Sequence, residues 1–280
     1  MIRPATATAV LGLAVLIAAV AGCGLGGHGD ELRIAYLPVA EEVELGRAVA
    51  PYVESDFGGR VDNPALQAYV RTVGERVARC TPLHALPYSF SVVEGSAAAT
   101  VALPGGTVYV TRGLLDKLQT EGELAAALAR PMVHINERHT GRQIVQKFGL
   151  PGLREIISAP DNAARRARLA RLGVAIRDLP YSAEMQSDAD RLGLDYVAAA
   201  GYNPAAMVRL LEIIVLPAEP KASPAAADAG SRVAVIRNMA ARKYMDRGGR
   251  VGREEYQREV LDRLNANPPR PVSPLNGGSS

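Results

Sequence analysis

Two histidines and a glutamate stand close together in the run His134-Ile135-Asn136-Glu137-Arg138-His139. Imidazole nitrogens and carboxylate oxygens are zinc ligands, and a spacing of three residues places His134 and Glu137 on one face of a helix. His134 and His139 are five residues apart, which separates them by about 140° around an ideal helix. We therefore expect these two imidazoles to diverge, and we interpret the three side chains as polar groups at the surface or beside a site.

The helix that carries His134 has a clear beginning. Thr120-Glu121-Gly122-Glu123 is a capping box, and the helix that it opens is expected to reach His139. Pro131 lies inside this helix, where it removes one backbone hydrogen bond and presses its ring toward the carbonyl of Ala127. The sequence therefore predicts a kink at Pro131.

Other helices are predicted on both sides of this one. A helix begins at Tyr181 or Ser182, passes Asp188 and Asp190, and stops near Gly201. Helical composition and capping signals predict further helices that start near Val39 and end near Pro51, start at Pro64 after the cap Asn63, and start at Asn203-Pro204.

Alternating apolar and polar residues predict short strands at Tyr88–Val93 and Thr107–Thr111. The segment Ala97–Ala102 can pair with the second of them through the turn Leu103-Pro104-Gly105-Gly106. We expect an α+β fold that is mostly helical and contains a small antiparallel sheet.

Composition excludes few classes of protein. The 280 residues are 48% hydrophobic and 22% charged, which is typical of a globular chain. The net charge of +3 is too small to indicate a nucleic-acid-binding surface, so we expect no nucleic acid partner.

The first residues indicate export. A short basic start precedes the apolar run Ala9–Val20, which is too short for a comfortable membrane-spanning helix. The run ends in Val20-Ala21-Gly22-Cys23, which resembles a bacterial lipobox, so we expect cleavage after residue 22 and acylation of Cys23. An uncleaved anchor or a plain secretory signal is the alternative. Gly24 is not the Asp of an inner-membrane retention signal, which favours an outer-membrane anchor facing the periplasm.

Five segments in order resemble a family of membrane-associated zinc endopeptidases, peptidase family M48, which includes the CAAX prenyl endopeptidase, HtpX and BepA-like envelope peptidases. The matching segments are Ala102-Leu103-Pro104-Gly105-Gly106, Thr111-Arg112-Gly113-Leu114-Leu115, Glu123-Leu124-Ala125-Ala126-Ala127-Leu128-Ala129, Ala189-Asp190-Arg191-Leu192-Gly193 and Gly201-Tyr202-Asn203-Pro204. The resemblance implies a gluzincin-like metallopeptidase domain, which we assign to residues 39–264. The flanking parts are then the signal peptide (1–22), the lipidated Cys and spacer (23–38) and a disordered Pro/Gly/Ser tail (265–280).

The resemblance implies the site of this family. That site has two zinc-binding His four residues apart, a general-base Glu directly after the first His, and a Glu on a later helix as the third ligand. Arg130 stands at the first His position and offers no lone pair to a metal. Pro131 stands at the position of the catalytic Glu, and Gln186 replaces the Glu ligand with a weaker amide oxygen. His134 matches the second His, so His134 and Gln186 are what is left of the metal site.

Arg130 could itself take the place of the metal. We expect its guanidinium to occupy the vacated cation position and to pair with Asp190, or with Glu184 or Asp188 on the same helix. A fixed positive charge would then replace zinc in holding two helices together.

We therefore expect a divergent, inactive lipoprotein member of the family, without a cofactor, that binds unfolded or envelope polypeptides in envelope protein quality control. An extended segment could add to the sheet edge at Ala99, Leu103, Gly105 and Gly106. The alternative is an active zinc metalloendopeptidase with unusual ligands, and a third possibility is a structural lipoprotein of an envelope complex.

Overall fold

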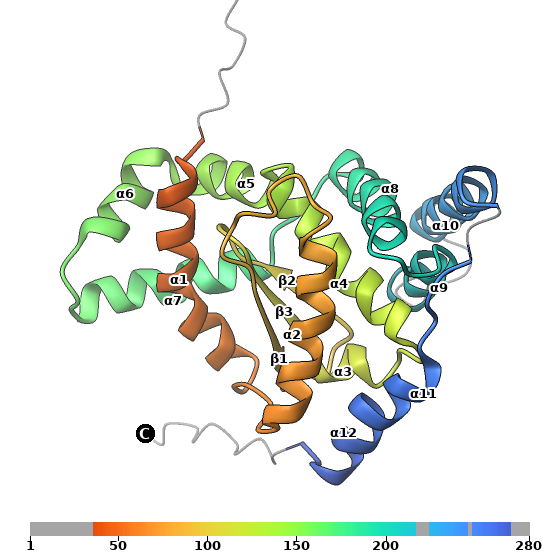
Figure 1. The fold of residues 1–280 in the computed structure, drawn as a ribbon. Coiled ribbons are helices and arrows are strands. Elements are labelled where there is room, and N and C mark those ends of the chain that lie inside the picture. Colours follow the sequence, from red (N-terminus) through yellow and green to blue (C-terminus); the bar gives the residue numbers. More distant parts are fainter. Residues whose placement is uncertain (1–35, 217–223, 246–247, 270–280) are drawn as a thin grey trace, which may run out of the picture. The chain divides into compact units, whose positions relative to one another are not determined.

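The structure of the protein is a computed structural model that describes residues 36–216, 224–245 and 248–269. Most of this part is helical, and one three-stranded sheet lies among the helices (Figure 1), which confirms the predicted mostly helical α+β class. The helices are α1 (Val39–Asp56), α2 (Pro64–Ala78), α3 (Arg112–Leu115), α4 (Glu121–Asn136), α5 (His139–Phe148), α6 (Leu150–Ser158), α7 (Ala163–Arg177), α8 (Ala183–Ala199), α9 (Ala205–Ile214), α10 (Pro224–Lys243), α11 (Arg253–Tyr256), the π-helix η2 (Gln257–Leu261) and α12 (Asp262–Ala266). The strands are β1 (Ser89–Val93), β2 (Thr100–Ala102) and β3 (Thr107–Thr111).

The predicted signal peptide, Cys23 and residues 270–280 of the predicted tail lie outside the described residues. Within the described residues, none of the helices has the length and apolar character that crossing a membrane requires.

Side-chain caps explain where two of the central helices begin. Asn63 Oδ1 accepts a hydrogen bond from the Leu66 amide at 3.0 Å at the start of α2. Thr120 Oγ1 accepts from the Glu123 amide at 3.1 Å at the start of α4, and the Glu123 carboxylate accepts from the Gln119 amide at 2.7 Å. Both helices therefore start where the sequence predicts.

The end of α1 is different from the prediction. The helix continues through Pro51 to Asp56, because the turn beyond the proline still buries Val53 against the core. Apolar burial here outweighs the backbone hydrogen bond that Pro51 cannot donate.

The sheet has the strand order β1-β3-β2 and is mixed, so the prediction of an antiparallel sheet is wrong for one pair. Strands β2 and β3 are antiparallel, as the tight turn at Leu103–Gly106 requires. Strand β1 runs parallel to β3, with Ser89 opposite Thr107. A tight turn fixes only the strands that it joins, and the longer connection from β1 to β2 lets the chain cross to the far side of β3.

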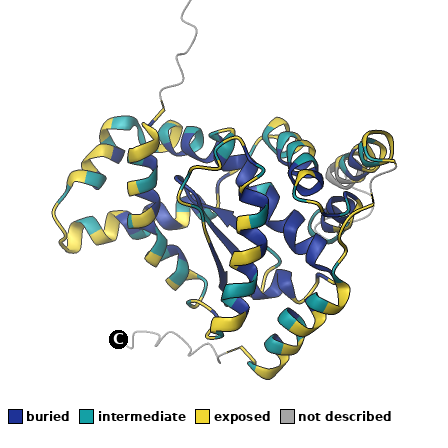
Figure 2. Cartoon of the chain, viewed as in Figure 1, coloured by how far each residue is buried: buried dark blue, intermediate teal, exposed yellow. Residues whose placement is uncertain are grey.

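The sheet separates two apolar cores. Alternation along β3 directs Val108 and Val110 into a core formed with α2, α4, α8 and α9, and Tyr109 into a second core with α1, α6 and α7. In Figure 2 the strands and α4 are buried almost throughout, whereas the outer helices expose one side. The two helices that the sequence predicts to carry the site, α4 and α8, pack against each other in the first core.

The last described segment packs back onto the centre of the fold. Tyr256 is fully buried, and its hydroxyl donates to the Leu115 carbonyl at 2.7 Å. The buried Arg112 pairs with Glu94 at 2.7 Å and also donates to the carbonyl of Leu264 in α12 at 3.4 Å. These contacts make residues 249–266 part of the domain.

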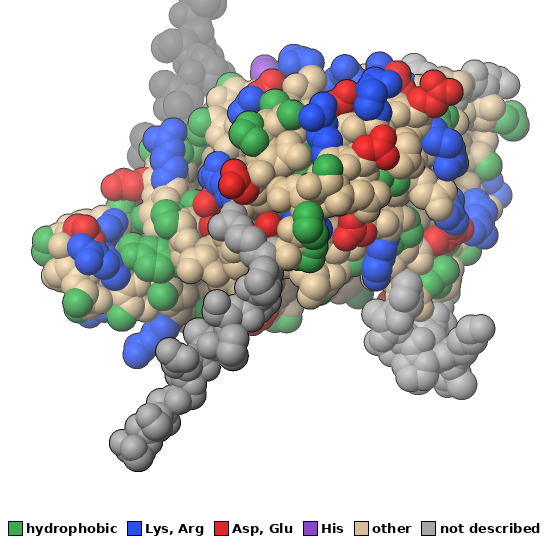
Figure 3. All heavy atoms as spheres, turned by 90° about the horizontal axis from the view of Figure 1, so that it is seen from below, with side chains coloured by type: hydrophobic (Ala, Val, Ile, Leu, Met, Phe, Trp, Pro, Cys, Tyr) green, Lys and Arg blue, Asp and Glu red, His purple; other side chains and the backbone are tan. Residues whose placement is uncertain are grey.

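Surface charge is mixed in sign on the face in Figure 3, where basic and acidic side chains lie next to one another. Pairs such as Arg154 with Glu41 and Arg166 with Asp161, both at 2.9 Å, are exposed, so water screens them and they add little to stability.

Candidate functional site

Arg130 links α4 to α8. Its Nε donates to Asp190 Oδ1 at 2.7 Å, and its Nη2 donates to Gln186 Oε1 at 2.6 Å. The Arg130 side chain is 12% exposed and that of Asp190 is 2% exposed, so the ion pair is largely removed from water. Of the carboxylates considered from the sequence, the structure places Asp190 against Arg130.

A second arginine shares Asp190. Arg232 of α10 donates to the other carboxylate oxygen, Oδ2, from Nη2 at 2.7 Å and from Nε at 3.0 Å. One carboxylate therefore faces two guanidinium groups and joins three helices. Nothing in the sequence around Arg232 indicated this role, because it depends on how α10 packs against α8.

His134 and His139 lie together, so the expectation that they diverge is wrong. Their Nδ1 atoms are 3.1 Å apart and both side chains are buried. Helix α4 ends at Asn136, Arg138 adopts a left-handed conformation with φ 57°, and α5 begins at His139. The chain reverses at Arg138 and brings the imidazole of His139 back to that of His134. The expected angle of about 140° assumed one continuous helix, which these residues do not form.

The contact between the two rings requires opposite roles for the two Nδ1 atoms. One Nδ1 must carry a proton and the other must offer a lone pair, so at most one of the two imidazoles can be charged. Burial, followed by the positive charge of Arg130, lowers the pKa of His134 to about 2. Burial also lowers the pKa of His139. The pair is therefore uncharged at neutral pH.

Tyr181 covers His134 from the other side. The two rings stack with centroids 3.8 Å apart and an interplanar angle of 13°. The Tyr181 hydroxyl lies 2.9 Å from Thr140 Oγ1, which fixes the ring. Sequence reasoning named Tyr181 only as a possible helix start and missed this contact.

Glu137 is not part of this group. It is exposed and forms the C-terminal cap of α4. The acidic side chain nearest the imidazoles is instead Asp188, whose Oδ2 is 4.0 Å from His139 Nε2.

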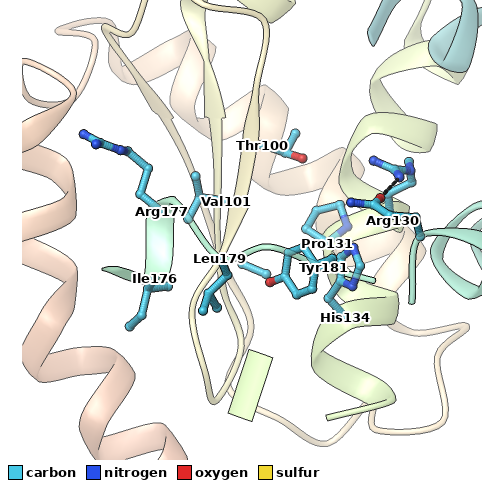
Figure 4. A pocket seen from close by; sticks show the side chains of 11 residues that line it. Thr100, Val101, Arg130, Pro131, His134, Ile176, Arg177, Leu179 and Tyr181 are labelled. Carbon is cyan, nitrogen blue, oxygen red and sulfur yellow. Dashed lines mark hydrogen bonds between the residues drawn. The ribbon is translucent and has the colours of Figure 1, made fainter. Parts of the chain in front are cut away.

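A pocket of about 190 Å³ lies between α4 and β2 (Figure 4). Arg130, Pro131 and His134 form one side of it, and Ile176 and Arg177 form the opposite side. The full lining is Thr100, Val101, Ala102, Arg130, Pro131, His134, Ile176, Arg177, Leu179, Tyr181 and Gln186.

Three of the four residues expected at an open sheet edge are elsewhere. Leu103, Gly105 and Gly106 are buried in the turn between β2 and β3. At Gly105 an added Cβ would lie 2.3 Å from Val43 Cα of α1, which shows how closely the turn is covered. Ala99 is half-buried and bonds to Thr111. The part of the edge that lines the pocket is β2 itself.

Residues 64–256 match the family model of peptidase family M48. The chain belongs to this family. The match contains α2, the sheet, α4 and α8, and therefore every side chain of the site described above.

The M48 relatives include bacterial proteins and mitochondrial ones. The putative beta-barrel assembly-enhancing protease of Vibrio cholerae is 26% identical over 52% of this chain and 32% of its own length. The beta-barrel assembly-enhancing protease of Escherichia coli K12 is 23% identical over 63% of this chain and 38% of its own length. The mitochondrial metalloendopeptidase OMA1 of Schizosaccharomyces pombe is 26% identical over 57% of this chain and 48% of its own length. The chain thus spans about a third to a half of the length of these three relatives.

Zinc, which the M48 family uses, does not fit the side chains present here. A tetrahedral site needs three protein ligands and an open position, and among the described residues no three His, Cys, Asp or Glu side chains converge in that way. Gln186 Oε1 already accepts a hydrogen bond from Arg130, and the guanidinium would repel a divalent cation. We therefore derive no step through a metal.

Proposed function

We propose that this M48 protein is a pseudopeptidase, a lipid-anchored envelope protein that binds polypeptide segments without cleaving them. The observation that carries the proposal is the hydrogen-bonded link from Arg130 to Asp190 and Gln186. It fills the space between α4 and α8 with a fixed cation and engages the side chain at the third ligand position.

The loss of the general base supports the same proposal. Pro131 lines the pocket where the family pattern has Glu, and its side chain cannot accept a proton from water. His134, the one retained ligand position, is buried under the Tyr181 ring and bonded through Nδ1 to His139. The site thus lacks the proton acceptor and the ligand set that peptide hydrolysis by this family requires.

Polypeptide binding is supported by the open edge of β2. In the antiparallel pair, the Thr111 amide bonds to the Ala99 carbonyl and the Leu103 amide to the Thr107 carbonyl. Backbone groups alternate in direction along a strand, so those of Thr100 and Ala102 point away from β3 and toward the pocket. An extended segment can add there through main-chain hydrogen bonds.

The cellular setting rests on the lipobox at Cys23 and on relatives named for enhancing beta-barrel assembly. We propose an outer-membrane anchor facing the periplasm and clients among unfolded envelope proteins. Mass spectrometry of the membrane-bound protein should find acyl chains on Cys23 at a new N-terminus. A Cys23→Ser variant that is still processed and membrane-bound would contradict the anchor.

Metal content and turnover test the loss of catalysis. Protein starting at Gly24 should bind an unfolded reporter such as reduced casein, contain no stoichiometric zinc and leave the casein intact. Stoichiometric zinc that a chelator removes together with casein cleavage would establish the active peptidase with unusual ligands. Failure to bind any unfolded protein would leave a structural role in an envelope complex.

A variant pair tests the binding edge. Thr100→Pro removes the outward amide of β2 and should weaken casein binding severalfold while the fold is kept, since proline is tolerated in edge strands. Thr100→Ala keeps the amide and is the matched control. Equal binding by both variants would place the client elsewhere.

A further inference from the structure

We infer that the pocket beside β2 recognises the C-terminal carboxylate of a polypeptide, and that Arg130 is the recognising group. The inference rests on the proposed polypeptide binding and adds the chemical class of the ligand. It follows from the unused donors of the guanidinium, the charge of the pocket, the edge of β2 and the size of the space.

Arg130 lines the pocket and retains donors that no described residue uses. A guanidinium has five N–H groups, and Arg130 uses Nε for Asp190 and Nη2 for Gln186. Its Nη1 amino group has no hydrogen-bond acceptor among the described residues, yet it is not a buried unsatisfied group. Two hydrogen bonds hold the side chain in place, and the unused Nη1 donors remain for a ligand, as carboxylate recognition by arginine requires.

The pocket is electropositive. This charge comes from Arg130, because no Asp or Glu lines the pocket and Arg177, its other cation, is paired with Asp178 and Asp56. Asp190, which lies behind Arg130, is shared with Arg232 and so does not neutralise both guanidinium groups. A carboxylate that enters this pocket meets a net positive charge.

Arg177 is the less suitable of the two cations. Its Nε and Nη2 donate to Asp178, both at 2.8 Å, and its Nη1 donates to Asp56. In Figure 4 its guanidinium points away from Arg130. Arg177 is therefore not the recognising group, since its donors and its charge are engaged by Asp178 and Asp56.

The edge of β2 leads to Arg130. Strand β2 packs against α4, and Thr100 and Ala102 line the same pocket as Arg130 with their backbone groups directed outward. A segment that adds to this edge is thereby delivered to the guanidinium. Main-chain hydrogen bonds would hold the strand without regard to sequence, and the charge would select where the strand ends.

The size of the pocket favours a chain end. A volume of about 190 Å³ is smaller than the roughly 300–1,000 Å³ of pockets that enclose whole small-molecule ligands. The stacked rings of His134 and Tyr181 close one side of it. A terminal residue with its carboxylate fits this space better than a chain that continues. Such termini are what peptide-bond hydrolysis produces, so proteases would supply the ligand.

The test is the affinity of protein starting at Gly24 for a pool of short random-sequence peptides made as free acids and again as C-terminal amides. Each pool carries an N-terminal fluorophore for anisotropy. The free acids should bind about tenfold more tightly or better, as expected for one charge-assisted hydrogen bond. Arg130→Gln should abolish the preference and Arg130→Lys should keep part of it. Arg154→Gln removes an exposed arginine that does not line the pocket and should keep all of the preference.

The failure of this inference can be distinguished from the failure of the proposed function. Equal binding of acids and amides, with casein still bound, overturns carboxylate recognition alone. A preference that survives Arg130→Gln in a variant with unchanged circular dichroism overturns the assignment to Arg130. Absence of binding to both pools and to casein overturns the proposed function itself.

Discussion

Arg130 joins α4 to α8 in the way that a metal ion could. A zinc ion would hold α4 and α8 through its ligands, and the guanidinium holds them through hydrogen bonds to Asp190 and Gln186. Arginine suits this role because its planar donors match a carboxylate and an amide oxygen at the same time. The link between the helices therefore depends on the carboxylate of Asp190, which both Arg130 and Arg232 contact.

Removal of that carboxylate should be costly. Asp190→Asn leaves two guanidinium groups partly buried without their counterion, and we expect the free energy of unfolding to fall by about 3–5 kcal/mol. Urea denaturation followed by circular dichroism measures this loss. The matched control is Asp188→Asn on the same helix, whose pair with Arg191 is exposed and should change stability by at most about 1 kcal/mol. Similar small losses for both variants would show that the shared ion pair does not stabilise the fold.

The neutral histidine pair should make stability depend on pH. The pKa of His134 is lowered to about 2 in the folded chain, whereas the unfolded chain takes up the proton near pH 6.5. The unfolded state therefore binds more protons below pH 6.5, and stability present above that pH is lost as the pH falls toward 2. Between about pH 7.5 and pH 5, His134 alone should lower the free energy of unfolding by about 2 kcal/mol.

A His134→Gln variant isolates this contribution. Its unfolding free energy should fall less between these two pH values than that of the unchanged protein, by about 2 kcal/mol. Urea titrations at each pH give both slopes. Parallel slopes would mean that His134 is accessible to protons in the folded state.

Among the elements, the helices were more predictable than the connections between them. The caps at Asn63 and Thr120 fix the starts of α2 and α4 through local hydrogen bonds, which are readable from the sequence. The direction of β1 and the meeting of His134 with His139 depend on a crossing connection and on the left-handed Arg138. Neither feature has a local sequence signal. Residues with long side chains rarely adopt the left-handed conformation, so the sequence gives no reason to expect it at Arg138.

The same distinction holds for the site. Arg130, Pro131 and Gln186 could be assigned because the family segments align them with ligand and base positions. The positions of Arg232 and Tyr181 required the packing of α10 and of the segment before α8, which the sequence does not reveal.

Helices α4 and α8 should still present a metal site when the lost side chains return. The triple variant Arg130→His, Pro131→Glu and Gln186→Glu restores two ligands and the base beside His134, and it should bind zinc stoichiometrically. Elemental analysis and the visible spectrum of the cobalt-substituted protein report binding without reference to activity. Adding His134→Ala to the triple variant should abolish the metal signal. A folded triple variant without metal would show that the two helices no longer hold the required separation.

At the scale of the whole molecule, the chain after α10 closes the main core. Tyr256 and Val260 are fully buried and Leu264 is 3% exposed, all in the same core as α4. Glu121 at the start of α4 is 1% exposed and accepts hydrogen bonds from Tyr202 at 2.7 Å and from Arg250 at 2.9 Å. The segment around residue 250 therefore compensates a buried charge beside the helix that carries the site.

A chain that ends at Gly248 should not fold cooperatively. It loses three buried side chains, each worth about 1.5–3 kcal/mol, and leaves Glu121 without Arg250, which together approach the total stability of a typical domain. Expression of the truncated chain should give aggregated protein, or soluble protein with no cooperative urea transition and with strong binding of a hydrophobic dye. A chain that ends at Pro269 is the control and should match the full-length protein, because it keeps every described contact of α11, η2 and α12. Cooperative unfolding of the shorter chain would show that residues 249–269 are an appendage, and that α4 holds Arg130 and the pocket without them.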